Sequence, residues 1–119
     1  MSAGSRKDEK TAELLMHLAA EYFNREGNKD SLITFTNAEM LDRGRRANIY
    51  FTVLPVDREE QALEFVRRKR NDFRLFVMQK NLFGFMPQIN FALDQGEKNR
   101  QRIDSLLNDS QIDTAESTG

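Results

Sequence analysis

The densest run of positive charge in the chain lies between positions 67 and 80. It contains six cations, namely Arg67, Arg68, Lys69, Arg70, Arg74 and Lys80. Only one acid, Asp72, interrupts it. Guanidinium groups match phosphate oxygens, and release of counterions favours their association with a nucleic acid. The alternative is a solvated helix face that pairs with Glu60 or Glu64 one turn earlier, and the residues alone leave both interpretations open.

On a regular helix, Arg67, Arg70 and Arg74 would share one flank. A second basic cluster surrounds Gly44 in a predicted turn and consists of Arg43, Arg45 and Arg46. Three arginines in four residues are denser than solubility requires, and glycine lets the backbone approach a ligand closely. We therefore treat the turn as a second candidate contact for phosphates.

Apolar side chains flank Gly84 ahead of the last predicted strand. Phe83, Phe85 and Met86 could stack on nucleic-acid bases. Aromatic residues at the entrance to a strand more often belong to the core, however, and we predict a core position for most of these three. Tyr50 is likewise predicted to cover a strand face or to pack against a helix.

The residues needed for most kinds of catalysis are missing from the sequence. His17 is the only histidine and there is no cysteine, so no His–His or Cys–His metal-ligand set can form. Neither a phosphate-binding loop of the G-x-x-x-x-G-K type nor a G-x-S-x-G nucleophile motif is present. Asp57 and Glu60 are explained as a capping box that starts a helix. We expect a protein that is not an enzyme and has no metal, no cofactor and no small-molecule substrate.

The composition allows one domain with a modest core. The chain has 119 residues, of which 39% are hydrophobic and nine are Phe. The net charge of −1, from 18 basic and 19 acidic residues, argues against a uniformly basic nucleic-acid binder. Whether the protein binds a nucleic acid therefore depends on how its cations are clustered along the chain. No apolar stretch is long enough for a membrane span, and the first ten residues lack the apolar segment of a secretory signal. We expect no membrane partner.

Hydrophobic periodicity predicts a helix followed by a hairpin. Spacings of three and four place apolar residues on one face of a helix from Thr11 to about Arg25. The segment 32–41 favours a strand, but its apolar residues alternate regularly only if there is a slip or a bulge near Asn37. Residues 47–54 alternate strictly and form the second strand.

A second helical segment follows Pro55. Its buried stripe is carried by Ala62 and Val66 and resumes at Phe73, but cations occupy the intervening core positions. We predict a break between Lys69 and Asp72 that gives two helices in series; the alternative is a straight helix whose long cationic side chains reach solvent.

Two further elements complete the chain. A third strand is predicted over 87–94 and a short helix over 97–107. The result is an α+β fold in the order helix, strand, strand, helix, helix, strand, with a three-stranded sheet and helices on one face.

This order, with an interrupted helix, resembles the type II KH fold of the ribosome-binding factor A family. Several local patterns are similar to that family's motifs: Ile33-Thr34-Phe35-Thr36, Ala47 to Val53, Phe73-Arg74, Pro87-Gln88-Ile89-Asn90-Phe91 with Asp94, and Ile103-Asp104-Ser105-Leu106-Leu107. The resemblance covers about Thr11 to Leu107. Each motif alone is weak, and their order and spacing carry it.

The resemblance implies a cytoplasmic, monomeric, non-catalytic factor that binds the small ribosomal subunit and its rRNA and acts in rRNA processing and late assembly. A general KH-like RNA-binding protein and a protein-interaction module are the alternatives. The KH-like domain is expected over 8–107, between a disordered N-terminus, 1–7, and a disordered acidic and polar tail, 108–119. The predicted RNA-binding residues are Arg43, Arg45, Arg46, Arg67, Arg68, Lys69, Arg70, Asn71, Arg74 and Lys80.

The chain departs from the family at two places. Small residues usually form the kink between the paired helices, whereas this chain has Lys69, Arg70 and Asn71 there. Three outcomes are open for the kink: it is straightened, it is shifted, or it is stabilised by Asn71 or Asp72 as a cap of the second helix. The family tends to carry an Asp-Leu pair in the hairpin turn, where this chain has the arginine cluster around Gly44.

Overall fold

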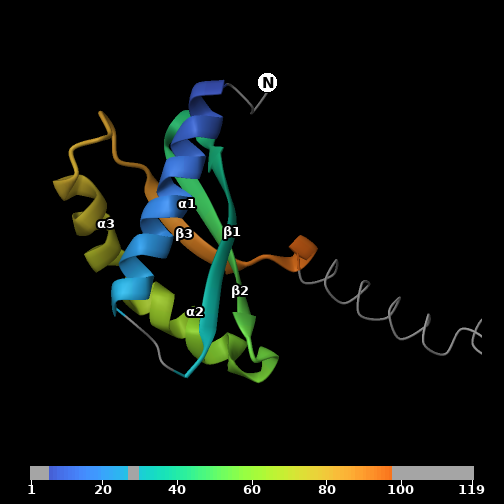
Figure 1. Ribbon diagram of the computed structural model, residues 1–119. Coiled ribbons are helices and arrows are strands. Elements are labelled where there is room, and N and C mark those ends of the chain that lie inside the picture. The colour runs from blue at the N-terminus through green and yellow to red at the C-terminus, as the bar shows by residue number, and fades with distance from the viewer. Residues whose placement is uncertain (1–5, 27–29, 98–119) are drawn as a thin grey trace, which may run out of the picture.

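The computed structural model describes residues 6–26 and 30–97, which form three helices and a three-stranded sheet (Figure 1). In chain order the elements are α1 (Arg6–Glu26), β1 (Leu32–Leu41), β2 (Arg46–Leu54), α2 (Glu59–Arg68), α3 (Arg70–Gln79) and β3 (Gln88–Leu93). Short 3-10 turns, Asp42–Gly44 and Val56–Arg58, precede β2 and α2. The α+β fold and the order of its elements are as predicted, and α1 begins five residues earlier than expected.

The sheet is mixed, with the strands in the order β1-β2-β3. β1 and β2 form an antiparallel hairpin, whereas β2 and β3 are parallel. A parallel pair needs a long crossover, and here α2 and α3 supply it. Alternate residues of β2, including Ile49 and Phe51, are fully buried under the helices, so the helices cover one face of the sheet.

The predicted irregularity in β1 is a β-bulge. Phe35 lies opposite Phe51 and Asn37 lies opposite Tyr50, so Thr36 has no partner in the ladder. The extra residue returns Ala38 and later apolar side chains to the core face. The hydroxyl of Thr36 donates a hydrogen bond to the carboxylate of Asp94, which follows β3.

The core is centred on aromatic rings from every layer. Phe23 of α1 lies 5.5 Å from the ring of Phe91 in β3, and Phe73 of α3 lies 5.7 Å from the same ring. Tyr22 of α1 also contacts Phe73, at 5.8 Å between centroids. These rings join α1, α3 and the sheet, and α3 therefore holds its position relative to β3.

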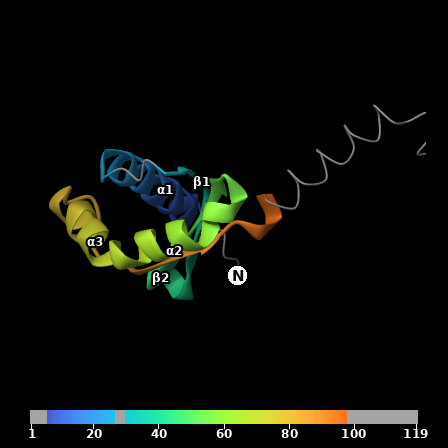
Figure 2. The ribbon, with the colours of Figure 1, turned by 90° about the horizontal axis from the view of Figure 1, so that it is seen from below.

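The long helical segment is broken at Lys69, as predicted (Figure 2). Lys69 has φ −90° and ψ 6°, outside the helical region. Backbone hydrogen bonds cross the junction, because its amide donates to Phe65 and its carbonyl accepts from Phe73 at 2.9 Å. The change of direction brings Val66 of α2 and Phe73 of α3 into the same core, where both are fully buried.

Neither of the two predicted helix caps is present. Lys69 itself occupies the N-cap position of α3 without a side-chain hydrogen bond, so of the alternatives for the kink the cap by Asn71 or Asp72 does not form. The capping box at α2 was also wrong, because Asp57 lies inside a 3-10 turn and Arg58 takes the N-cap position without a side-chain hydrogen bond. α2 begins after its candidate cap Asp57, whereas α3 begins before Asn71 and Asp72, which therefore lie inside its first turn.

The turn between β1 and β2 is left-handed. Asp42 and Arg43 have φ 56° and Gly44 has φ 85°. The amide of Arg45 closes the turn on the carbonyl of Asp42 at 3.1 Å. A Cβ atom at Gly44 would meet nothing within 4 Å, so the requirement for glycine comes from the backbone conformation alone.

Replacing Gly44 with alanine is therefore expected to lower the free energy of unfolding by about 1–2 kcal/mol. Chemical denaturation measures this change. Gly84→Ala is the matched control, because a Cβ atom there also meets open space and its φ is not in the left-handed region. An equal loss in the two variants would contradict the explanation.

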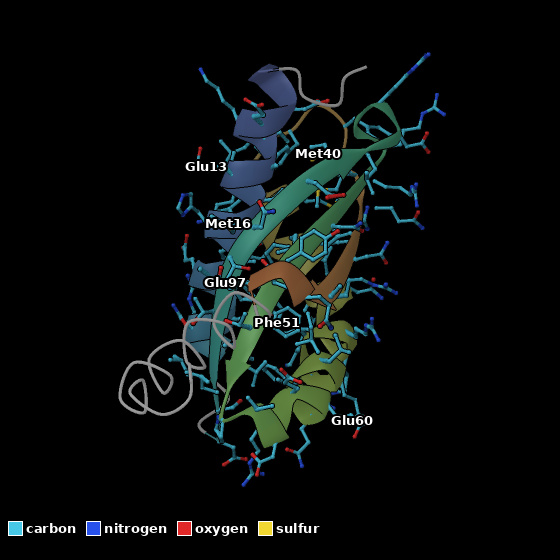
Figure 3. All side chains as sticks on the ribbon, turned by 90° about the vertical axis from the view of Figure 1, so that its right-hand side faces the viewer. Glu13, Met16, Met40, Phe51, Glu60 and Glu97 are labelled. Atoms are coloured by element: carbon cyan, nitrogen blue, oxygen red, sulfur yellow. The ribbon has the colours of Figure 1, made fainter. Side chains whose placement is uncertain are left out.

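Asp94 connects the end of β3 to the rest of the sheet. Its amide donates to Phe51 at 2.8 Å, and its carboxylate accepts the amide of Glu97 at 2.9 Å. This second bond is an N-cap for residues 95–97, which are helical. Figure 3 labels Glu97 in this segment, which lies in front of the strands in that view, and Figure 1 shows the segment extending away from the sheet. Of the helix expected over 97–107 only residue 97 is described, and the expected tail and the first five residues lie outside the described residues.

Candidate functional site

Three segments that are distant in sequence meet at one end of the β2–β3 pair. The amide of Gln88 donates to the carbonyl of Arg45 at 2.9 Å. Arg46 and Ala47 of β2 lie opposite Gln88 and Ile89 of β3. The first turns of α3 lie beside them, and the connection from α3 to β3 passes over this end of the molecule (Figure 1). The parallel pairing thus brings the hairpin turn next to the α3 cations.

These segments enclose an open groove of about 460 Å³, which we call the α3 groove. Its lining residues are Arg45, Arg70, Asn71, Arg74, Phe85, Met86, Gln88 and Ile89. Arg45 comes from the turn, the next three residues come from α3, and the rest come from the approach to β3 and its first residues. The two basic clusters that the sequence separates therefore contribute to one surface.

The α3 groove is positively charged, because none of the described residues that line it is acidic. Arg70 donates to the side chain of Asn90 at 3.4 Å. Within the described part of the chain Arg45 and Arg74 form no ion pair, and the Nε atom of Arg74 is buried without a hydrogen-bond partner. Three guanidinium groups around a hollow, none of them paired with a carboxylate among the described residues, can bind phosphate groups.

The groove also has polar and aromatic groups that carry no charge. Asn71 and Gln88 are exposed, and each carboxamide offers both a donor and an acceptor. Phe85 is 66% exposed, although sequence position favoured the core, whereas Phe83 and Met86 pack against the core as predicted. The arrangement combines donors for phosphates, hydrogen-bonding groups and an aromatic face.

The structure separates Arg67 from the groove. Its guanidinium donates to the carbonyl of Phe91 at 3.3 Å and lines a different hollow on the outer side of α2. The flank that Arg67 would share with Arg70 and Arg74 on a regular helix does not form, because the break at Lys69 ends the regular helix between them. Arg68 lines that same outer hollow, with its guanidinium 5.9 Å from the ring of Phe65.

The remaining predicted residues lie around the groove or away from it. Arg46 pairs with Asp42 at 3.8 Å, and Arg43 is exposed in the turn. Lys69 is half-buried at the helix junction. Lys80 lies near the far end of α3, where it pairs with Glu21 at 3.5 Å and stands 4.7 Å from the ring of Phe76. Of the ten predicted residues, the groove brings together Arg45, Arg70, Asn71 and Arg74.

Four groove residues were not among the predicted contacts: Phe85, Met86, Gln88 and Ile89. Phe85 had a signal in the sequence, since it stands beside Gly84 in a segment without periodicity, where an aromatic residue is not required by a helix or strand. Gln88 had a weaker signal, because it is the first residue of β3 and lies on the exposed face of the strand. Neither signal identifies the groove without the parallel pairing.

Groups that could hold a metal are absent from the residues the structure describes. His17 is exposed on α1, 3.8 Å from Glu13. Over the same residues no helix has both the length and the apolar character that crossing a membrane requires.

The order of elements, the mixed sheet and the broken helix define a small α+β domain with a cationic groove beside the break. The model of the family "Ribosome-binding factor A" matches residues 7–107. The chain belongs to the ribosome-binding factor A family. Membership gives it a role as a ribosome-binding factor without catalytic activity.

Individual relatives agree with the family match. The chain is similar to the ribosome-binding factor A of Geotalea daltonii, with 31% identity over 86% of this chain and 85% of the relative. It is 27% identical to that of a Methylobacterium species, over 91% of this chain and 81% of the relative. Its structure resembles the Thermus thermophilus ribosome-binding factor A, with a TM-score of 0.63, 16% identity and coverage of 72% and 93% of the two chains. The Thermotoga maritima protein, a putative ribosome binding factor A, gives a TM-score of 0.52 with 26% identity over 73% and 82%.

Proposed function

We propose that this protein binds the immature small ribosomal subunit through its rRNA and acts in rRNA processing and late assembly, as a cytoplasmic monomer. The observation that carries the proposal is the α3 groove, where Arg45, Arg70 and Arg74 converge from two separate segments. The choice of the small subunit rests on the family resemblance.

The groove supports a mechanism of binding without bond chemistry. Its cations are held on a helix and a closed turn, and the hydrogen bond between Gln88 and Arg45 joins the turn to the start of β3, the strand that follows α3. A rigid set of guanidinium groups selects the RNA conformation whose phosphates match it. The bound conformation is thereby stabilised, and the factor leaves when maturation of the subunit removes or closes that RNA surface.

Co-sedimentation with purified ribosomal subunits tests the proposal. We expect the protein to pellet with immature small subunits at low salt and to be released as salt rises, because phosphate contacts displace counterions. Nuclease treatment of the subunits should abolish pelleting. Equal pelleting with large subunits would contradict the choice of subunit, and binding that ignores both salt and nuclease would contradict an RNA contact.

The same assay separates the proposal from general RNA binding. A short unstructured RNA added as competitor should displace the protein from small subunits only in large molar excess over subunits. Displacement at equimolar concentration would instead identify a KH-like protein that binds RNA without preference for the subunit.

A further inference from the structure

We infer that the α3 groove takes an unpaired nucleotide, with the base stacked on Phe85 and its phosphates on the neighbouring arginines. This inference rests on the proposed function and specifies which part of the RNA enters the groove. It starts from Phe85, which is 66% exposed although it lies in a segment whose neighbours Phe83 and Met86 pack against the core. An exposed aromatic ring beside three arginines is a stacking surface next to a phosphate site.

The uncharged groups of the groove support a base as the ligand. A groove that contacted only the backbone of a duplex could use carboxamides for phosphate contacts, but it would have no use for an aromatic face. Asn71 and Gln88 line the groove together with Phe85, and their side chains can donate to and accept from the edge of a base. Base faces and pairing edges are accessible only where the RNA is unpaired.

The position of the cations fits a single strand that crosses the groove. Arg70 and Arg74 lie one turn apart on α3, and Arg45 reaches the same hollow from the hairpin turn. The guanidinium groups therefore border the hollow from two different elements. A strand with its base directed to Phe85 places consecutive phosphates at these two sides.

The test uses the full chain with Phe85→Trp, because the protein contains no tryptophan and the new ring becomes its only indole fluorophore. Three probes are titrated: a short unstructured RNA strand, the blunt duplex of the same sequence, and inorganic polyphosphate. We expect the single strand to quench and shift the tryptophan emission, because a base stacks on the ring. Polyphosphate should bind the arginines without this change. The same quenching with polyphosphate, or a bound single strand that leaves the emission unchanged, would overturn the inference.

An affinity measurement on Phe85→Ala provides a second readout. Loss of one stacked base should weaken binding of the single strand roughly 5- to 150-fold and leave binding of polyphosphate almost unchanged. Leu82→Ala is the control, since Leu82 is 54% exposed three residues away and does not line the groove. Unchanged affinity of Phe85→Ala for the single strand would refute stacking. Failure of the proposed function can be distinguished from failure of the stacking inference. If the proposed function fails, the wild-type protein does not pellet with small subunits at all.

Discussion

Replacing Arg45, Arg70 and Arg74 together with alanine is expected to weaken binding to small ribosomal subunits by on the order of 100-fold or more at low salt. Hydrogen bonds to charged groups contribute ~1.5–3 kcal/mol each, and every ~1.4 kcal/mol is a factor of ten in affinity. Three such contacts, even reduced by solvent screening to about 1 kcal/mol each, account for a loss of this size. All three side chains line the same groove, so the triple substitution removes the cationic groups of a single binding surface.

The dependence of affinity on salt should change in the same variant. Each phosphate contact contributes about 0.7–0.9 to the slope of log K against log salt concentration. Losing three contacts therefore lowers the slope by about 2–3. Binding measured by co-sedimentation or by anisotropy of labelled RNA between low and moderate salt gives this slope directly.

A control variant separates the position of the cations from the net charge. Lys10→Ala, Arg25→Ala and Arg58→Ala remove three exposed cations that lie outside the groove, so the change in net charge is identical. We expect this variant to keep most of the affinity. Equal losses in the two triple variants would show that overall charge and not the α3 groove governs binding.

Phe73→Ala is expected to lower the free energy of unfolding by about 3–5 kcal/mol. Phe73 is fully buried and its ring contacts those of Tyr22, Phe23, Phe76 and Phe91. Truncation therefore leaves a cavity where α1, α3 and β3 meet. Domains of this kind are stable by about 5–15 kcal/mol in total, so the loss is a large share of the stability.

Chemical denaturation followed by circular dichroism measures this loss. Leu75→Ala is the control on the same helix, because Leu75 is 56% exposed and surface substitutions usually change stability by less than about 0.5 kcal/mol. A cost for Phe73→Ala as small as that of Leu75→Ala would mean that α3 does not depend on the aromatic core for its position.

Periodicity predicted the fold well because burial repeats differently in helices and strands. The bulge in β1 followed from a break in alternation near Asn37, and the break after α2 followed from cations at the core position of Lys69. The helix caps were not predictable in this way. Candidate caps at Asp57 and Asn71 had the right residue types, but the backbone turns that precede α2 and α3 moved both boundaries.

The candidate site was predictable in part. The high local density of cations in the sequence identified Arg45, Arg70 and Arg74 as members of two basic clusters. It gave no reason to expect that the two clusters lie together in the fold. Their proximity depends on the parallel register of β2 and β3, a contact that leaves no local pattern. For the same reason the position of Phe85 beside Gly84 did not identify it as a groove residue, whereas Arg67 is separated from the groove by the helix break at Lys69.

The hydrogen bond between Gln88 and Arg45 has a consequence for the newly made chain. A ribosome that has synthesised the protein as far as Lys80 has already produced every arginine of the groove, yet β3 does not exist. The hairpin of β1 and β2 closes a short loop, whereas pairing of β2 with β3 must close a long one, at a larger entropic cost and a slower rate. An unfinished chain therefore carries positive charge without the groove, and RNA recognition begins only when the last strand has docked.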